Sequence, residues 1–373
     1  MRQTDHVKLE AVELRRIGLP LVAPFRTSFG TETHKDALIV RALGPEGEGW
    51  AECVAMTDPL YSSEYVDAVE HVVRHHLLPR VFALGDVTAV GVGAALEPVK
   101  GHRMAKAALE TAVLDAELRI AGVSLAAHLG STKDAVDSGV SVGIMDSIPK
   151  LLDTLTGYLE QGYLRIKLKI EPGWDVEPVR AVRERWPDIL LQVDANTAYT
   201  LADARHLAKL DPFDLLLIEQ PLPEDDVLGH ADLARVIKTP VCLDESIESA
   251  RDAASAIRLG AAAIINIKPG RVGGYLEARR IHDVCVAHGI PVWCGGMLET
   301  GIGRAANVAL ASLPGFTLPG DTSASDRYFT RDVTEPFTLV DGRLRVPTGP
   351  GIGVEPIAEI LDELTTAKDL VRP

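Results

Sequence analysis

Five charged residues recur at a nearly constant interval in the second half of the sequence. They are Lys169, Asp194, Glu219, Asp244 and Lys268, and successive members are separated by 25, 25, 25 and 24 residues. Each ends a short apolar run of the kind that forms a buried β-strand. Such an interval holds one strand and one helix, so consecutive strands lie parallel and their carboxyl ends meet at one face. The pattern therefore predicts a single site assembled from segments that are distant in the sequence.

The three acids of this set indicate a divalent-cation site. Carboxylates that converge repel one another unless a positive charge lies among them. Asp194, Glu219 and Asp244 supply only hard oxygen ligands, which favours Mg²⁺, with Mn²⁺ or another divalent cation as a substitute, over zinc or copper. For each acid taken alone, the alternative is that it caps the following helix. The repeated spacing, with a lysine before and after the acids, favours the metal site.

The lysines indicate acid–base chemistry at carbon. Lys167 and Lys169 lie two residues apart in one expected strand, so both point to the same face, the barrel interior. Burial and a neighbouring cation lower the pKa of Lys169 towards a value useful for a base. Lys268 follows the acids and is expected on the opposite side of a bound ligand.

This arrangement suits removal of a proton next to a carboxylate. A metal that bridges the carboxylate oxygens stabilises the enediolate formed when the α-proton leaves. Two opposed lysines allow the proton to leave one face and return on the other, which is racemisation. If the substrate carries a β leaving group, the same enediolate expels it, which is dehydration.

Short apolar runs alternate with helical stretches from about residue 138. This alternation predicts the fold class, an α/β modified TIM barrel, (β/α)7β, beside an α+β capping domain. We expect the N-terminal capping domain over residues 1–132, the barrel over 133–320, and a C-terminal segment that returns to the cap over 321–373. The expected barrel strands are 139–142, 165–169, 190–194, 215–219, 241–244, 263–268 and 291–294, with an eighth near 316–318.

The capping unit shows a different pattern. Residues 7–53 read as antiparallel strands, and residues 64–76 and 104–120 read as amphipathic helices. The tail returns to hairpin-like patterning at 338–340 and 343–346 and is expected to pack back on this unit.

The composition disfavours nucleic-acid and membrane partners. A formal net charge of −15 lacks the concentrated positive surface that both need, so an anionic substrate must rely on local cations. The 373-residue chain has ordinary globular composition, with 46% hydrophobic and 24% charged residues. It shows no signal-peptide-like or membrane-spanning run, and its four cysteines form no CxxC pair. We expect a cytoplasmic protein with reduced thiols.

Several motifs resemble one family over essentially the whole chain. They are RIKLK at 165–169, VDAN at 193–196, IEQP at 218–221, LDES at 243–246 and NIKPGRVGG at 266–274. These motifs resemble the muconate-lactonizing subgroup of the enolase superfamily. Within that subgroup, PLVAPFRTSFGT at 20–31 and WCGGMLETG at 293–301 are similar to the N-acylamino acid racemase / o-succinylbenzoate synthase enzymes.

The resemblance implies roles for individual residues. It implies that Asp194, Glu219 and Asp244 bind Mg²⁺ and that Lys169 and Lys268 form the acid–base pair. Glu245 would support the metal ligands. Lys167 and Asn196 would contact the substrate carboxylate or nearby metal ligands, and contacts with the substrate are also implied for Ser141, Gly296, Met297 and Leu298.

The resemblance also implies that the cap closes over the barrel mouth. The corresponding stretches, 23–34 and 54–65, are punctuated by Gly, Ser, Thr or Pro and read as loops. Their anchors Phe25, Met56 and Tyr61 would contact the substrate in a lid that excludes water. The alternative is that Phe25, Phe29 and Met56 belong to the core of the cap.

The implied activity is racemisation of N-acyl, in particular N-succinyl, amino acids, syn dehydration to o-succinylbenzoate in the menaquinone pathway, or both. The substrate is a small carboxylate, and a homo-oligomer is expected. Arg26, Arg304 and Arg327 are candidates for binding a distal acyl carboxylate, with surface ion pairs as the alternative. A dipeptide epimerase, with an acidic pair near 321–326, and a muconate cycloisomerase are rival activities. A barrel without catalysis that acts as a binding protein is the rival outside the class.

Overall fold

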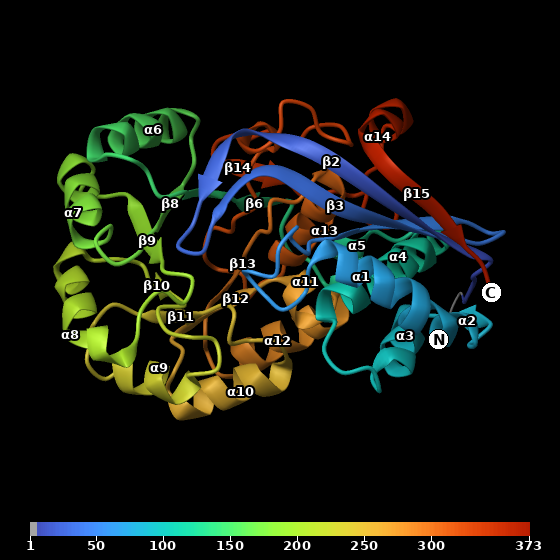
Figure 1. The fold of residues 1–373 in the computed structure, drawn as a ribbon, viewed down its shortest axis with the longest axis horizontal. Coiled ribbons are helices and arrows are strands. Elements are labelled where there is room, and N and C mark those ends of the chain that lie inside the picture. Colours follow the sequence, from blue (N-terminus) through green and yellow to red (C-terminus); the bar gives the residue numbers. More distant parts are fainter. Residues whose placement is uncertain (1–5) are drawn as a thin grey trace.

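A curled sheet of seven parallel strands forms one half of the molecule in the computed structural model, which describes residues 6–373. Strands that follow one another in the sequence are neighbours in this sheet, and Figure 1 shows helices arranged around its outer side. The strands are β7 (Gly139–Val142), β8 (Arg165–Lys169), β9 (Leu190–Asp194), β10 (Ile218–Glu219), β11 (Val241–Leu243), β12 (Ile264–Ile267) and β13 (Val292–Cys294).

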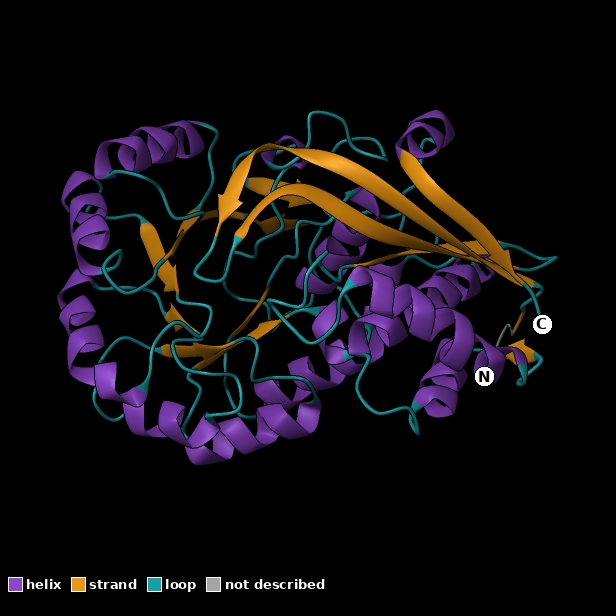
Figure 2. Cartoon of the chain, in the orientation of Figure 1, coloured by secondary structure: helices purple, strands orange, loops and turns teal. Residues whose placement is uncertain are grey.

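Helices connect these strands and cover them, as the helical rim in Figure 2 shows. The connecting helices are α6 (Ile148–Glu160), α7 (Val176–Arg185), α8 (Ala204–Leu207), α9 (Val227–Leu233), α10 (Ala250–Leu259), α11 (Pro269–Val272) and α12 (Tyr275–Ala287), and α13 (Gly301–Ala311) follows β13. The predicted fold class is confirmed, with strands close to the predicted positions.

Residues 316–320 complete the ring between β13 and β7. Phe316 forms a parallel bridge to Val292, and Gly320 forms one to Ser138. Both are isolated bridges, so the expected eighth strand at 316–318 is not a regular one. Pro319 lacks a backbone N–H and therefore cannot donate to a ladder. The segment nevertheless delivers Asp321 to the same end of the barrel as the other strand ends.

The cap contains a four-stranded antiparallel sheet in the order β15, β2, β3, β4. Its strands are β2 (Ala11–Arg26), β3 (Thr31–Leu43), β4 (Glu48–Cys53) and β15 (Thr365–Val371). The remaining short strands are β1 (Val7–Lys8), β5 (Asp86–Val87), β6 (Ala135–Asp137) and β14 (Arg343–Arg345). The helices are α1 (Val66–Val72), α2 (Leu78–Phe82), α3 (Ala89–Leu96), α4 (Arg103–Ala121), α5 (Leu125–Leu129) and α14 (Ala358–Leu364).

The tail divides between the two halves of the molecule. Strand β15 pairs with β2 and so joins the cap sheet, whereas β14 pairs with β6. The tail therefore returns to the cap as expected through residues 365–371, whereas the hairpin-like residues 343–345 pair with β6 instead. The expected helix over 64–76 begins at Val66 and continues after Val72 as a π-helical turn.

The hairpin of β2 and β3 carries the cap to the barrel mouth (Figure 1). Its strands stay paired as far as Arg26 and Thr31, so the expected loop over 23–34 is in fact a hairpin end. At its tip, Ser28 Oγ donates to the carbonyl oxygens of Ala195 at 3.0 Å and Asn196 at 3.2 Å. Cross-strand pairing thus holds this part of the cap over the ends of the barrel strands.

Two further features concern the described chain as a whole. Among residues 6–373, no helix combines the length and apolarity needed to cross a bilayer. All four cysteines are buried and free.

Candidate active site

Strand β8 directs three cations into the barrel. Ile166 and Leu168 pack among the buried apolar residues between barrel and helices, so the alternate residues Arg165, Lys167 and Lys169 point inward. All three cations are buried, with exposed fractions of 0%, 2% and 7%. Buried cations need partners, and the carboxylates of neighbouring strand ends supply them.

Lys169 lies against the end of β9. Its Nζ donates to Asp194 Oδ2 and to Asn196 Oδ1, each at 2.6 Å. Burial lowers the pKa of Lys169, and the positive charge of Lys167 lowers it further, while Asp194 opposes the shift. The lowered pKa agrees with the direction expected from the sequence.

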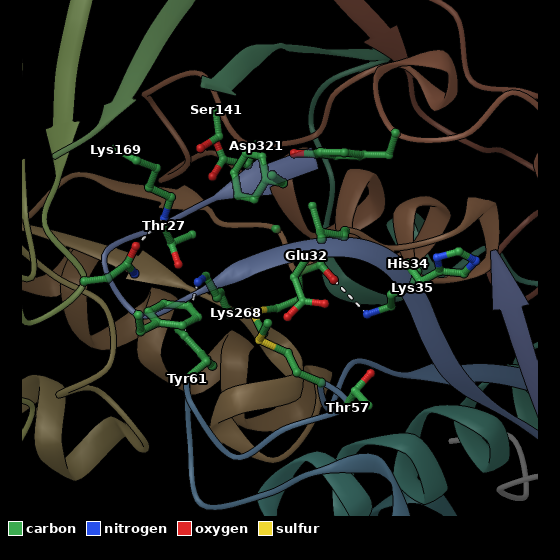
Figure 3. A pocket seen from close by; sticks show the side chains of 18 of the residues that line it. Thr27, Glu32, His34, Lys35, Thr57, Tyr61, Ser141, Lys169, Lys268 and Asp321 are labelled. Carbon is green, nitrogen blue, oxygen red and sulfur yellow. Dashed lines mark hydrogen bonds between the residues drawn. The ribbon is translucent and has the colours of Figure 1, made fainter. Parts of the chain in front are cut away.

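Lys268 follows β12 and lies across the barrel mouth from Lys169, since β9, β10 and β11 separate their strands. Its Nζ donates to Asp244 Oδ2 at 2.8 Å and to the Tyr61 hydroxyl at 3.1 Å. Burial acts to lower the pKa of Lys268, but Tyr61 and nearby carboxylates raise it overall. Figure 3 shows both lysines in the wall of one cavity.

The three acids at the strand ends are each held by cations of the chain. Lys167 Nζ lies 3.2 Å from Asp194 Oδ2 and 3.1 Å from Glu219 Oε2. Asp244 pairs with Lys268 and with Arg271, a residue not singled out from the sequence although it lies within the NIKPGRVGG motif. Burial opposes ionisation of Asp194, but Lys169 and Lys167 lower its pKa overall.

The donor set of this site fits a hard divalent cation. Within residues 6–373, no three His, Cys, Asp or Glu side chains gather as a ready-made metal cage, because lysine and arginine nitrogens lie against the acids. The acids nevertheless present only oxygen donors, the type that Mg²⁺ prefers. Glu245 Oε2 is buried without a hydrogen-bond partner. Burial, reinforced by Asp194, raises the pKa of Glu245 to about 7 although the charge of Lys268 opposes the shift, so a cation bound nearby would favour the ionised form of Glu245.

Asp321 is part of the site, although the sequence marked the segment 321–326 only as an acidic pair of the rival dipeptide epimerase. Its carboxylate lies 2.6 Å from Lys167 Nζ and 2.9 Å from an Arg165 nitrogen. Burial acts to raise the pKa of Asp321, but these two cations lower it to about 2. Both cations also lie over the Trp293 ring, at 5.1 Å for Arg165 and 4.9 Å for Lys167. The alternation of Arg165, Lys167 and Lys169 was the signal that could have indicated an additional acid.

The substrate contacts implied by the sequence all line one cavity between cap and barrel. The barrel contributes Ser141, Lys167, Lys169, Asn196, Lys268, Gly296, Met297 and Leu298, and the cap contributes Phe25, Met56 and Tyr61. Asp194, Glu219, Asp244 and Glu245 lie behind this wall; the Asn196 amide donates to Glu245 Oε1 at 2.8 Å. The structure therefore brings the predicted residues together, and their individual roles stay predictions.

Further residues line this cavity beyond the substrate contacts named from the sequence. Thr27, Phe29, Glu32, His34 and Thr57 lie within the stretches 23–34 and 54–65 expected at the barrel mouth, whereas Lys35, Asp36 and Tyr328 lie outside them. Phe25 meets Tyr328 edge to face, with 6.2 Å between ring centroids. Lys35 and Asp36 lie on β3, where no motif marked them, and the pairing of β3 with β2 brings them over the barrel.

The three arginines considered for a distal carboxylate lie elsewhere. Among the described residues that line the cavity, none is Arg26, Arg304 or Arg327. Arg26 pairs with Glu171 at 2.8 Å, and Arg327 donates to the Ser141 carbonyl at 2.7 Å. Arg304 is buried and donates to the Glu299 carbonyl at 2.7 Å.

The fold and this ring of lysines and carboxylates define a barrel enzyme with its reactive groups at the carboxyl ends of the strands. Comparisons with known proteins agree. Residues 150–360 match the family model described as enolase C-terminal domain-like, and residues 11–130 match the mandelate racemase / muconate lactonizing enzyme N-terminal domain. The chain belongs to the enolase superfamily and is an enzyme of the isomerase and lyase type.

Individual relatives with known names or structures are similar to this chain over nearly its whole length. An N-succinylamino acid racemase of Amycolatopsis sp is 71% identical, over 97% of this chain and 99% of the relative. An o-succinylbenzoate synthase of Geobacillus kaustophilus is 48% identical, over 94% of each chain. The crystal structure of an enolase superfamily member from Listeria innocua has a TM-score of 0.94 and 39% identity, covering 98% of this chain and 100% of that one. The family expected from the motifs is confirmed.

Proposed function

We propose that this enzyme removes the α-proton of N-acyl amino acids, preferably N-succinyl amino acids, and returns it on either face. The observation that carries the proposal is the position of Lys169 and Lys268 on opposite sides of one cavity, at the ends of β8 and β12. The racemase name of the relative at 71% identity supports this substrate class.

The proposed mechanism follows from the surroundings of the two lysines. The neutral amine of one lysine takes the α-proton while the ammonium of the other holds the proton to be returned. The lowered pKa of Lys169 favours its amine form, and the raised pKa of Lys268 favours its ammonium form. In the reverse direction the two roles exchange, so each lysine serves one enantiomer.

The remaining groups orient the substrate and stabilise its charge. Asp194, Glu219 and Asp244, with Glu245 beside them, would hold Mg²⁺ or Mn²⁺. When bound, the cation stabilises the negative charge that develops on the substrate carboxylate. Lys167, held by the acids around it, contributes a fixed positive charge to the cavity wall.

We also propose dehydration to o-succinylbenzoate, a step of the menaquinone pathway, as a second activity of the same site. It needs the same proton removal, and relatives at 48% identity carry the synthase name. A dipeptide epimerase is less well supported, because Asp321, the acid at the barrel end that could bind an α-ammonium group, is already paired with Arg165 and Lys167. A cytoplasmic homo-oligomer with reduced thiols remains part of the proposal.

The test is a comparison of two reactions on one preparation. Racemisation of an N-succinyl amino acid is followed by polarimetry and by α-proton exchange in D₂O, and synthase activity by the formation of o-succinylbenzoate from its precursor. We expect both activities to disappear with EDTA and to return with Mg²⁺. If the Mg²⁺-loaded enzyme exchanges no α-proton of any N-acyl amino acid, the racemase proposal is wrong.

A further inference from the structure

The cap contributes one lysine to the cavity, Lys35 on β3, and its environment differs from that of the barrel lysines. Lys167, Lys169 and Lys268 each have a carboxylate oxygen within 2.8 Å. Within residues 6–373, no carboxylate oxygen lies within the 4.0 Å ion-pair distance of Lys35 Nζ. Lys35 is only 4% exposed, and it lines the same cavity.

The hydrogen bonds of Lys35 leave donor capacity unused. Its Nζ donates to the Met297 carbonyl at 2.9 Å, the one hydrogen bond that it makes within the described chain. An ammonium group has three donors, and a buried ammonium without an anionic partner is costly. An anionic ligand that binds beside Lys35 would remove this cost.

Two acids near Lys35, one in space and one in the sequence, accept hydrogen bonds from other groups. Glu52 accepts from the Thr300 backbone N–H at 2.9 Å and from its hydroxyl at 2.7 Å, at the start of α13. Asp36 is held by Arg16, whose Nε lies 2.6 Å from it. Glu32 also lines the cavity but forms no ion pair with Lys35 within the described chain; burial raises the pKa of Glu32, and the charge of Lys35 opposes that shift. Lys35 therefore keeps its charge available to a ligand in the cavity.

The location of Lys35 indicates which part of a ligand it meets. Lys169 and Lys268 approach the cavity from the barrel, whereas Lys35 approaches from β3 of the cap, and Figure 3 shows it away from the other two. A protein with a net charge of −15 repels anions overall, so a second anionic group needs such a local cation.

We propose that Lys35 binds the terminal carboxylate of the acyl group, so that the enzyme selects N-acyl amino acids with a dicarboxylic acyl group over those with a neutral one. This inference rests on the proposed function and specifies its substrate. Arg26, Arg304 and Arg327 do not serve this purpose, since they lie outside the cavity wall described above.

The experiment compares three substrates that share one amino acid: its N-succinyl, N-succinamoyl and N-acetyl derivatives. The succinamoyl group keeps the length of the succinyl group and removes only its charge. The kcat/KM of each is measured for the wild type, Lys35→Met, Lys35→Arg and Lys133→Met. Lys133 is a matched control because its Nζ also donates to a backbone carbonyl, that of Phe316, at the opposite end of the barrel.

We expect the wild type to prefer succinyl over succinamoyl, and Lys35→Met to lower that ratio about tenfold to a hundredfold, the effect of one charge-assisted hydrogen bond. Lys35→Arg should retain most of the preference, and Lys133→Met all of it. Equal use of succinyl and succinamoyl by the wild type would overturn the inference without any variant. An equal loss for all substrates in Lys35→Met would also overturn it, because Lys35 would then act only through Met297.

Binding measured by calorimetry separates this inference from the proposed function. The Mg²⁺-loaded Lys169→Ala/Lys268→Ala protein is titrated with the same three ligands, with and without Lys35→Met. Binding that prefers succinyl through Lys35, without turnover by the wild type, would support the role of Lys35 and refute the racemase proposal. Turnover without a charge preference would refute only the role of Lys35, and absence of both binding and turnover would refute both.

Discussion

Glu110 offers a test of how the cap and the barrel are joined. It lies on α4 of the cap and is buried, and its Oε1 accepts from the Leu276 backbone N–H at 3.1 Å, at the start of α12. Gly274, at the N-cap of α12, leaves room for this contact, since a Cβ there would lie 2.0 Å from Glu110 Oε1. Burial raises the pKa of Glu110 from 4.5 to about 7, although backbone N–H groups of α12 oppose the shift.

The sign of the pH dependence follows from this raised pKa. The folded protein holds the Glu110 proton more tightly than the unfolded chain does. Well below pH 4.5 the group is protonated in both states, so its raised pKa does not lower the free energy of unfolding there. Its cost to the folded state grows as the pH rises and becomes constant above about pH 7. With these two pKa values, the cost is about 2 kcal/mol at pH 6 and about 3 kcal/mol at pH 8.

Glu110→Gln removes the ionisable group and keeps an acceptor oxygen for α12. Between pH 6 and pH 8, we expect the free energy of unfolding of this variant to rise by about 1 kcal/mol relative to that of the wild type. Any effect of the substitution that does not depend on pH leaves this change unaltered. Urea unfolding at several pH values measures this gap. Glu177→Gln, on the exposed surface of α7, controls for the loss of one carboxylate. Parallel stability curves for Glu110→Gln and the wild type would refute the reasoning.

The other predictions concern the site and the packing of the cap. Lys169→Ala should slow the α-proton exchange of one enantiomer in D₂O, followed by NMR, by a factor of about 10² or more, while the other enantiomer still exchanges. Lys268→Ala should show the mirror pattern. Racemisation at full rate by either variant would contradict a mechanism with two bases. Gly49→Ala should lower the free energy of unfolding in urea by about 1–3 kcal/mol, because the new Cβ would lie 2.1 Å from the Ala112 carbonyl oxygen; an unchanged midpoint would show that β4 and α4 separate easily. Asp321→Asn should cost about 3–5 kcal/mol by the same measurement, because it removes the carboxylate partner of the buried Arg165 and one of the partners of Lys167. Wild-type stability would contradict the ion-pair account.

The barrel could be predicted because its information is local and repeated. Each strand is a short apolar run, and the charge that ends it recurs with the period of one strand and one helix, so Lys169, Asp194 and Lys268 could be assigned to one ring before any coordinates. Segments without such a period were harder. The chain at 316–320 makes only isolated bridges, and β14 pairs with β6 rather than with the cap, because these pairings depend on partners far away in the sequence.

The amino-acid sequence by itself determined the fold class, the family and the ring of acids and lysines, because periodic patterns encode which side of each element faces the interior. The tertiary structure decided which cations neutralise which acids. It placed Asp321 between Arg165 and Lys167, and it brought Lys35 of the cap into the wall of the cavity. Such contacts join residues that share no sequence period, and electrostatic interactions act over distances in space that only the folded chain defines.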